Sequence, residues 1–296
     1  MSRGIGGCMK YLIVLLSLCL LIVGCSVNNC NVQNHAIRVK SSFEKSNPEE
    51  YYSILSKLEL LSQLEKDVLH KQYVTTNDFS ENVLGVKTML DTDEKVIALT
   101  LDACGGEYGS GYDEALIDFL IAENIKATIF VNARWIDTNM EQFLQLASNP
   151  LFSIENHGTE HKPLAIRPHF AWGIQSTTSQ EEVVNEIMGN QVKITELTGY
   201  TPSYFRSGTA YYDEASVKIA NDLRLEVVNF SVNGDAGATF SQERVKQSLL
   251  QSTNGSIVIL HMNQPYSNTA AGVKEAIPIL ISQGYEFVHL YDYELK

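Results

Sequence analysis

Two histidines four residues apart could together hold a metal ion. His157 and His161 begin and end the segment His-Gly-Thr-Glu-His. On a helical turn this spacing brings both imidazoles to one side, as chelation requires. Imidazole suits zinc and the neighbouring transition metals. Two unrelated surface histidines would show the same spacing, so the pair alone leaves both interpretations open.

Other side chains capable of acid–base chemistry follow apolar runs that predict strands. They are Asp102 after 96–101, Arg206 at the end of 203–206, Asp235 beyond 226–232 and His261 at the end of 256–261. The histidine pair likewise follows the run 151–155. In α/β barrels the loops at the carboxyl ends of the strands build the active site. The sequence therefore predicts that these side chains meet at one rim.

The elements that must position them alternate from about residue 95 onward. Short apolar runs predict seven strands, over 96–101, 127–131, 151–155, 203–206, 226–232, 256–261 and 286–290. Stretches with helical periodicity lie between them, over 113–124, 140–147, 181–197, 213–223, 243–251 and 273–283. This alternation is typical of an α/β fold with a parallel sheet, which we expect to close into a barrel.

A further helix is predicted before the barrel. Asn47-Pro48 opens it, since proline suits the first helical turn, and leucines recur at helical spacing up to about Lys71. The pattern does not decide whether this helix packs on the barrel or on a partner. We expect a helical segment and linker over 47–93 and the catalytic domain over 94–296.

The N-terminal residues predict export and lipidation. Residues 1–24 hold two basic residues and no acid, and their apolar run, 11–23, is shorter than the roughly 20 residues of a spanning helix. The run ends before Cys25 and resembles a bacterial lipoprotein signal, in which that cysteine carries the lipid. An uncleaved anchor is the alternative. Residues 25–46 predict a solvated tether. We expect a cell-envelope protein, lipid-anchored to a membrane on its non-cytoplasmic side.

Composition excludes some functions. Among 296 residues, 35 are acidic and 22 are Lys or Arg, so the formal net charge is −13. A nucleic-acid partner is not expected, because binding the phosphate backbone needs a basic surplus. Of five cysteines, only Cys30 and Cys104 would remain beside the lipidated one, which excludes a disulfide scaffold, although a bridge between these two is possible.

Five segments in order resemble the polysaccharide deacetylases of carbohydrate esterase family 4. They are Thr100-Leu101-Asp102-Ala103-Cys104-Gly105-Gly106, His157–His161, Tyr204-Phe205-Arg206-Ser207-Gly208, Asn233-Gly234-Asp235 and Ile259-Leu260-His261. One segment would be a weak sign, but five in this order over 94–296 are specific. The resemblance implies a distorted (β/α)7 barrel. It also implies metal-dependent hydrolysis of N- or O-acetyl groups on a polysaccharide such as peptidoglycan.

The resemblance assigns a role to each candidate residue. His157 and His161 match metal ligands, for zinc above all, with cobalt, nickel or manganese as alternatives. Asp102 matches the general base that takes a proton from water. Arg206 matches the arginine that orients this base through a charge-assisted hydrogen bond. His261 matches the general acid that protonates the leaving group.

Two further positions match less closely. We expect Asp235 to keep His261 charged, because an adjacent carboxylate favours imidazolium, although Asn233 could be the aligned residue. Tyr211 matches a tyrosine whose backbone amide supports an oxyanion, so it is the expected substrate-binding residue. Four aromatic residues could stack on sugar rings, although such residues more often pack in a core: Phe170, Trp172, Tyr212 and Tyr266.

The sequence departs from the family pattern at Ala103. The family usually has two adjacent aspartates there, a base and then a metal ligand. Asp102 could bind the metal and leave the base role to another group, two imidazoles and water could suffice, or Cys104 could supply a thiolate. We favour Asp102 near the metal in either role, and Cys104 as a small packed residue.

Two functional hypotheses follow. The first is an envelope-anchored deacetylase, and the second is a lipid-anchored glycan-binding protein that kept the barrel and lost its chemistry through Ala103. Retention of Asp102, Arg206 and His261 favours the enzyme, because binding alone needs no acid and base. A glycoside hydrolase with paired carboxylates is a poorer hypothesis, since it gives no reason for the two histidines.

Overall fold

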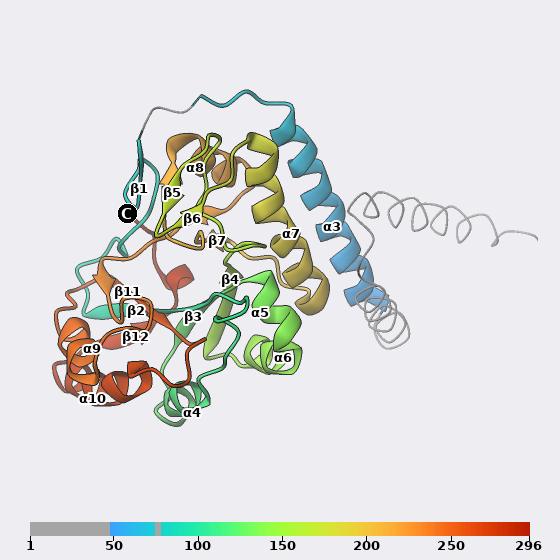
Figure 1. Cartoon of the computed structure of the whole chain (residues 1–296). Coiled ribbons are helices and arrows are strands. Elements are labelled where there is room, and N and C mark those ends of the chain that lie inside the picture. The colour runs from blue at the N-terminus through green and yellow to red at the C-terminus, as the bar shows by residue number, and fades with distance from the viewer. Residues whose placement is uncertain (1–47, 75–77) are drawn as a thin grey trace, which may run out of the picture. The chain divides into compact units, whose positions relative to one another are not determined.

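The computed structural model describes residues 48–74 and 78–296, of which 52–296 form one compact unit (Figure 1). The predicted signal peptide (1–24), the tether (25–46) and Cys25 lie outside the described residues. Within the described ranges, no helix is long and apolar enough to cross a membrane.

A curled sheet of parallel strands forms the centre of the compact unit. Its path runs through β10 (Val232–Asn233), β11 (Ser256–His261), β2 (Val96–Ala103), β3 (Ala127–Val131), β4 (Phe152–Asn156), β7 (Tyr204–Phe205) and β9 (Glu226–Val227). β12 (Glu286–Val288) pairs with the first residues of β2, before β3 takes over that edge. The outermost strands β10 and β9 are not paired with each other, so the expected barrel is distorted and not fully closed.

The strand predicted over 226–232 is instead two short strands at opposite ends of the sheet. Between them, the carbonyl oxygens of Val228 and Asn229 accept hydrogen bonds from the guanidinium of Arg206, at 3.0 Å each. These carbonyls are thereby occupied by a side chain and not by a neighbouring strand. The interruption of the strand is thus tied to the site at the rim.

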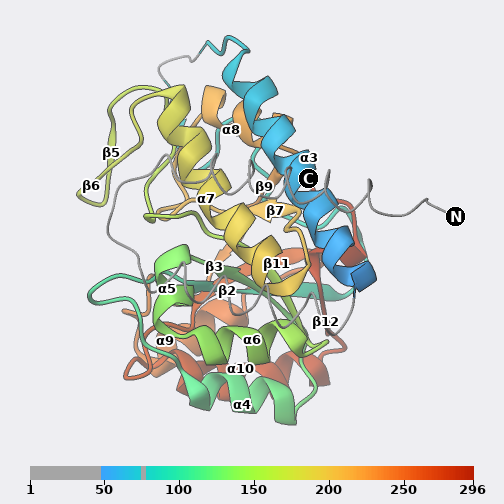
Figure 2. The same cartoon turned by 90° about the vertical axis from the view of Figure 1, so that its right-hand side faces the viewer.

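Helices pack along the outside of the sheet (Figure 2). The predicted helices are present as α4 (Glu114–Ala122), α6 (Met140–Ser148), α7 (Gln180–Thr198), α8 (Glu214–Asp222), α9 (Gln242–Leu249) and α10 (Thr269–Ser282). A short helix that the sequence patterns missed, α5 (Ala133–Thr138), is capped by Asn132, whose side chain accepts a hydrogen bond from Arg134 N.

The helix predicted near the N-terminus is α3 (Pro48–Leu69). Leu61 and Val68 share a hydrophobic cluster with Val183 and Ile187 of α7. Gln180 also donates a hydrogen bond to the carbonyl of Val68 at 2.8 Å. The open question is therefore answered, because this helix packs on the domain.

Side chains along β2 alternate between two layers. Leu99, Leu101 and Ala103 belong to the cluster beneath the outer helices. Thr100 and Asp102 point to the inner face, where both bond to Arg206. The alternation follows from the pleat of the strand, and it places the side chain of Ala103 away from the rim site.

One carboxyl group is buried inside the barrel without a cationic partner. Glu155 is fully buried and accepts hydrogen bonds from the hydroxyls of Ser153 and Tyr200 on one oxygen. Its other oxygen accepts from the backbone amides of Ser203 and Tyr204. Burial raises the pKa of this carboxyl to about 7, against the opposing effect of the hydrogen bonds. Protonation of the first oxygen is compatible with both hydroxyls, because hydroxyls can accept as well as donate.

We expect Glu155→Gln to make stability less dependent on pH. In the wild type the unfolded chain ionises Glu155 first, so stability falls as the pH rises from about 4.5 through about 7. The loss should reach about 3 kcal/mol in the wild type. The glutamine amide does not ionise, and its oxygen can accept from the two backbone amides while its nitrogen donates to the two hydroxyls. Urea denaturation of both proteins at pH 5 and pH 8 measures this. An equal difference in unfolding free energy at the two pH values would contradict it.

Candidate active site

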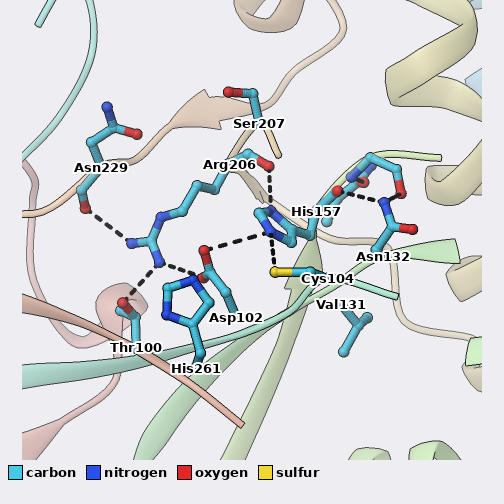
Figure 3. A network of polar contacts seen from close by, with 12 residues as sticks. Thr100, Asp102, Cys104, Val131, Asn132, His157, Arg206, Ser207, Asn229 and His261 are labelled. Carbon is cyan, nitrogen blue, oxygen red and sulfur yellow. Dashed lines mark hydrogen bonds and ion pairs between the residues drawn. The ribbon is translucent and has the colours of Figure 1, made fainter. Parts of the chain in front are cut away.

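The predicted residues meet at the carboxyl ends of the strands (Figure 3). Asp102 on β2 is paired in register with His261 on β11. Its carboxylate also contacts Arg206, which follows β7, and His157, which follows β4. The rings of His157 and His161 are 4.9 Å apart between centroids, edge to face. These contacts show that the side chains lie together at one rim, as expected.

Arg206 is fully buried, and its guanidinium donates four hydrogen bonds. Its guanidinium donates to Asp102 Oδ1 at 2.7 Å and to the Thr100 hydroxyl at 2.9 Å, and it binds the two carbonyls after β9. It also lies 4.2 Å from the ring centroid of Phe130, a cation–π contact. Burial would raise the pKa of Asp102, but Arg206 and the nearby histidines outweigh it and lower that pKa. Asp102 is thus held as a carboxylate.

The backbone carbonyl of Arg206 fixes the tautomer of His157. It lies 2.8 Å from His157 Nδ1, and because a carbonyl can only accept, Nδ1 carries the proton. His157 Nε2 then faces Asp102 Oδ2 at 3.5 Å and Cys104 Sγ at 3.9 Å. Burial lowers the pKa of this imidazole, and Asp102 more than compensates, so the pKa is raised overall. A cation would therefore take the position that a proton otherwise occupies at Nε2.

The loop between the two histidines is not the helical turn that the spacing suggested. His161 has a φ of 62°, in the left-handed region that side-chain-bearing residues rarely adopt. A Cβ atom on Gly208 would lie 2.2 Å from the His161 carbonyl oxygen, so only glycine allows this approach. The Nε2 atom of His161 is buried and has no hydrogen-bond partner among the described residues. The tight backbone, and not helical periodicity, brings the rings together.

Two side chains that sequence reasoning missed hold this loop. The buried carboxylate of Glu186 on α7 accepts hydrogen bonds from the backbone amides of Glu160 and Lys162. Asn132 donates to the carbonyls of His157 and Gly158. Neither has a signal in the sequence, because each acts on backbone atoms far along the chain. Thr100 was also missed, although its place two residues before Asp102 on one strand puts both on the same face.

Cys104, and not Ala103, points into the site. The ligand atoms of Cys104, His157 and His161 lie within 4.8 Å of one another. The expectation that Cys104 is only a small packed residue is therefore wrong in orientation, since its thiol faces two imidazoles. Burial disfavours the thiolate, but His161 and the other nearby histidines outweigh burial and lower the pKa of Cys104 well below its usual value. One sulfur and two nitrogens are a donor set that zinc and related metals accept.

His261 is paired with a buried carboxylate. Its Nδ1 lies 2.8 Å from Asp235 Oδ1, and its backbone amide donates to Asp235 Oδ2 at 2.7 Å. Thr269 donates to the same Oδ2. Burial lowers the pKa of His261, but Asp235 prevails and raises it well above its ordinary value. Asn233, the other residue considered for this role, instead accepts a hydrogen bond from the backbone of Ala236.

Tyr211 lies in the loop that follows Arg206. Its ring packs against Phe79 and Trp172, and its backbone amide has no hydrogen-bond acceptor among the described residues. Trp172 stands at the tip of the exposed hairpin β5–β6 (Phe170–Ala171 and Ile174–Gln175), and Tyr266 is exposed. Tyr212 is fully buried, with its hydroxyl bonded to the Ser207 amide, so it is not available to stack on a sugar.

Comparisons with known proteins point to one family. A family model described as Polysaccharide deacetylase matches residues 90–228. The peptidoglycan-N-acetylglucosamine deacetylase PgdA of Listeria monocytogenes is 27% identical over 228 residues, covering 74% of this chain and 42% of that protein. The chain thus spans less than half the length of that relative. A peptidoglycan-N-acetylglucosamine deacetylase of Bacillus cereus is 25% identical over 181 residues, covering 59% of this chain and 60% of the other.

Solved structures share the fold. The family 4 carbohydrate esterase PdaA of Bacillus subtilis has a TM-score of 0.59 at 21% identity, covering 79% of this chain and 88% of that one. A family 4 pseudoenzyme from Bacillus anthracis has a TM-score of 0.57 at 21% identity, with 68% and 66% covered. A family 4 acetyl xylan esterase from Clostridium thermocellum, in complex with a cobalt ion, has a TM-score of 0.55 at 24% identity, with 67% and 89% covered.

We expect Asp235→Asn to lower the pKa of His261. The amide keeps the shape of the carboxylate but removes the negative charge that favours the imidazolium, while the burial that disfavours it stays. A titration of the His261 ring followed by NMR measures the change. His289 serves as the internal reference, because it is buried and its ring contacts the carbonyl of Pro150. An unchanged pKa of His261 would show that Asp235 does not set its charge.

Proposed function

We propose that this chain hydrolyses acetyl groups on a polysaccharide, because residues 90–228 match a family model described as Polysaccharide deacetylase. The observation that carries this proposal is a pair of groups on neighbouring strands at one rim. One is a carboxylate held ionised by a buried arginine, and the other is an imidazole held protonated by a buried aspartate. Environments that push two pKa values apart in this way are typical of an acid and a base that work together.

We propose that the site holds a divalent metal ion, zinc first, with cobalt, nickel or manganese as alternatives. The protonated Nδ1 of His157 leaves its Nε2 lone pair free, and His161 Nε2 is buried without a partner. Both features fit a bound cation. When bound, the ion would polarise the acetyl carbonyl and lower the pKa of the attacking water.

The base and the acid then divide the proton transfers. Asp102 Oδ1 is occupied by Arg206, so Oδ2 accepts a proton from the attacking water as the new carbon–oxygen bond forms. His261 gives a proton to the leaving nitrogen or oxygen as its bond to the acetyl carbon breaks. Asp235 orients His261 through its hydrogen bond to Nδ1. The products are acetate and the free amine or alcohol of the sugar.

The substrate side is proposed from the loop after Arg206 and from the relatives. The backbone amide of Tyr211, which has no acceptor among the described residues, would support the oxyanion of the reacting carbonyl. Two relatives are named peptidoglycan-N-acetylglucosamine deacetylases, so an N-acetylated peptidoglycan glycan is our first substrate. The alternative is a glycan-binding protein without turnover, since one structural neighbour is described as a pseudoenzyme.

We expect the metal-loaded protein to release acetate from N-acetylated peptidoglycan fragments. Asp102→Asn and His261→Ala should each lower turnover by roughly 10²- to 10⁴-fold while metal stays bound, because each removes one proton-transfer step. His157→Ala and His161→Ala should lose the metal itself. Acetate release and elemental analysis of the same samples separate the two effects.

Two outcomes would contradict this proposal. Tight glycan binding without acetate release from any acetylated glycan would favour the glycan-binding protein. Unchanged metal content in the histidine variants would refute the ligand assignment.

We also propose that the protein is lipid-anchored at Cys25 to a membrane of the cell envelope, on the non-cytoplasmic side. The support is the short apolar run that ends just before this cysteine. We expect Cys25→Ser to lose incorporation of labelled fatty acid in a bacterial host, whereas Cys30→Ser should keep it. Label retained by the Cys25 variant would contradict lipidation at this residue.

A further inference from the structure

We infer that Cys104 is the third protein ligand of the metal site, as a thiolate beside His157 and His161, which leaves Asp102 free to act as the base. The inference rests on the proposed metal-dependent function and defines its ligand set. It also explains how a chain with alanine at position 103 keeps a complete site.

The first support is the direction of the side chains after β2. Ala103 is fully buried in the outer hydrophobic cluster, so a ligand at that position would point toward the helices. The next residue, Cys104, turns its sulfur toward His157 Nε2 at 3.9 Å. Ligand atoms around tetrahedral zinc lie roughly 3.5 Å apart, given bonds of about 2.0 to 2.3 Å. The observed separation is therefore close to the one that coordination needs.

The second support is the backbone that holds Cys104 there. Gly105 and Gly106 have φ angles of 72° and 86°, which turn the chain sharply after the cysteine. A Cβ atom on Gly105 would lie 2.6 Å from the backbone nitrogen of Trp135, so the chain packs too closely for any other residue. The thiol is thus placed by rigid packing and not by a mobile loop.

The third support is the division of work between Cys104 and Asp102. Among the described residues, the group whose ligand atoms all lie within 4.8 Å of one another contains Cys104 and the two histidines but not Asp102. Arg206 binds Asp102 Oδ1 at 2.7 Å, and Oδ2 faces His157 Nε2 at 3.5 Å. A carboxylate that keeps a free lone pair can accept a proton, whereas one bound to a cation is a poorer base. The buried Nε2 of His161, which has no other partner among these residues, completes the donor set.

The test is the absorption spectrum of the full chain in detergent, loaded with Co²⁺ in place of the native ion. A thiolate bound to cobalt gives a sulfur-to-metal charge-transfer band in the near ultraviolet, which nitrogen and oxygen ligands do not give. We expect this band in the wild type and in Asp102→Asn. We also expect it in Cys30→Ser, which controls for the other cysteine that would carry no lipid after cleavage of the signal peptide. We expect Cys104→Ser to lose the band and to bind cobalt at least roughly tenfold more weakly. Removing a residue that only hydrogen-bonds to a metal ligand already weakens metal binding by about tenfold or more, so removing a ligand itself should cost at least as much. Cys104→Asp should regain tight binding without the band, which shows that the fold tolerates substitution here.

Two results would overturn the inference. Cobalt bound at one ion per wild-type chain without the band, or a band that persists in Cys104→Ser, would remove Cys104 from the ligand set while the proposed deacetylase function stands. A wild-type chain that binds no cobalt at all would overturn the proposed metal-dependent function and this inference with it.

Discussion

The buried pair of Arg206 and Asp102 is the interaction on which the site depends. A guanidinium with no exposed surface is costly to bury unless all its donors are satisfied. Here one side chain bonds to β2 through Thr100 and Asp102, and to the two carbonyls after β9. Its own carbonyl fixes His157. The same residue therefore holds Asp102 in its ionised form and holds His157 in the tautomer that leaves Nε2 free.

A second constraint is that two opposite charges lie side by side at the rim, each with its own partner. Asp102 is held as an anion by Arg206, while His261 is held as a cation by Asp235, although these groups lie on neighbouring strands. Each buried charge has its own dedicated partner, so neither has to neutralise the other. That arrangement leaves one group ready to accept a proton and the other ready to donate one, which a structural ion pair between them would prevent.

Most of the fold follows from local sequence patterns, whereas the details of the site do not. Apolar runs and helical periodicity predict the strands and the long helices, because burial imposes those periods. The break in the strand over 226–232 could not be predicted, since the carbonyls there bind the side chain of Arg206, which lies on another strand's end. The direction of Cys104 is equally hidden, because it depends on where β2 ends and on the tight approach of Gly105 to α5. The support of the histidine loop could not be predicted either, because Glu186 lies on α7, a separate element that follows the loop in the sequence.

The loop between His157 and His161 contains features that destabilise the folded state. It contains a left-handed histidine, a glycine contact that tolerates no side chain, and a buried ring nitrogen without a partner among the described residues. Each of these features costs free energy, of the order of 1–3 kcal/mol for such a backbone conformation or such an unsatisfied group. The side chains of Glu186 and Asn132 hold that loop in place through hydrogen bonds to its backbone. A protein that used this surface only to bind glycan would gain nothing from two converging imidazoles, so the cost is consistent with a loop shaped for a cation.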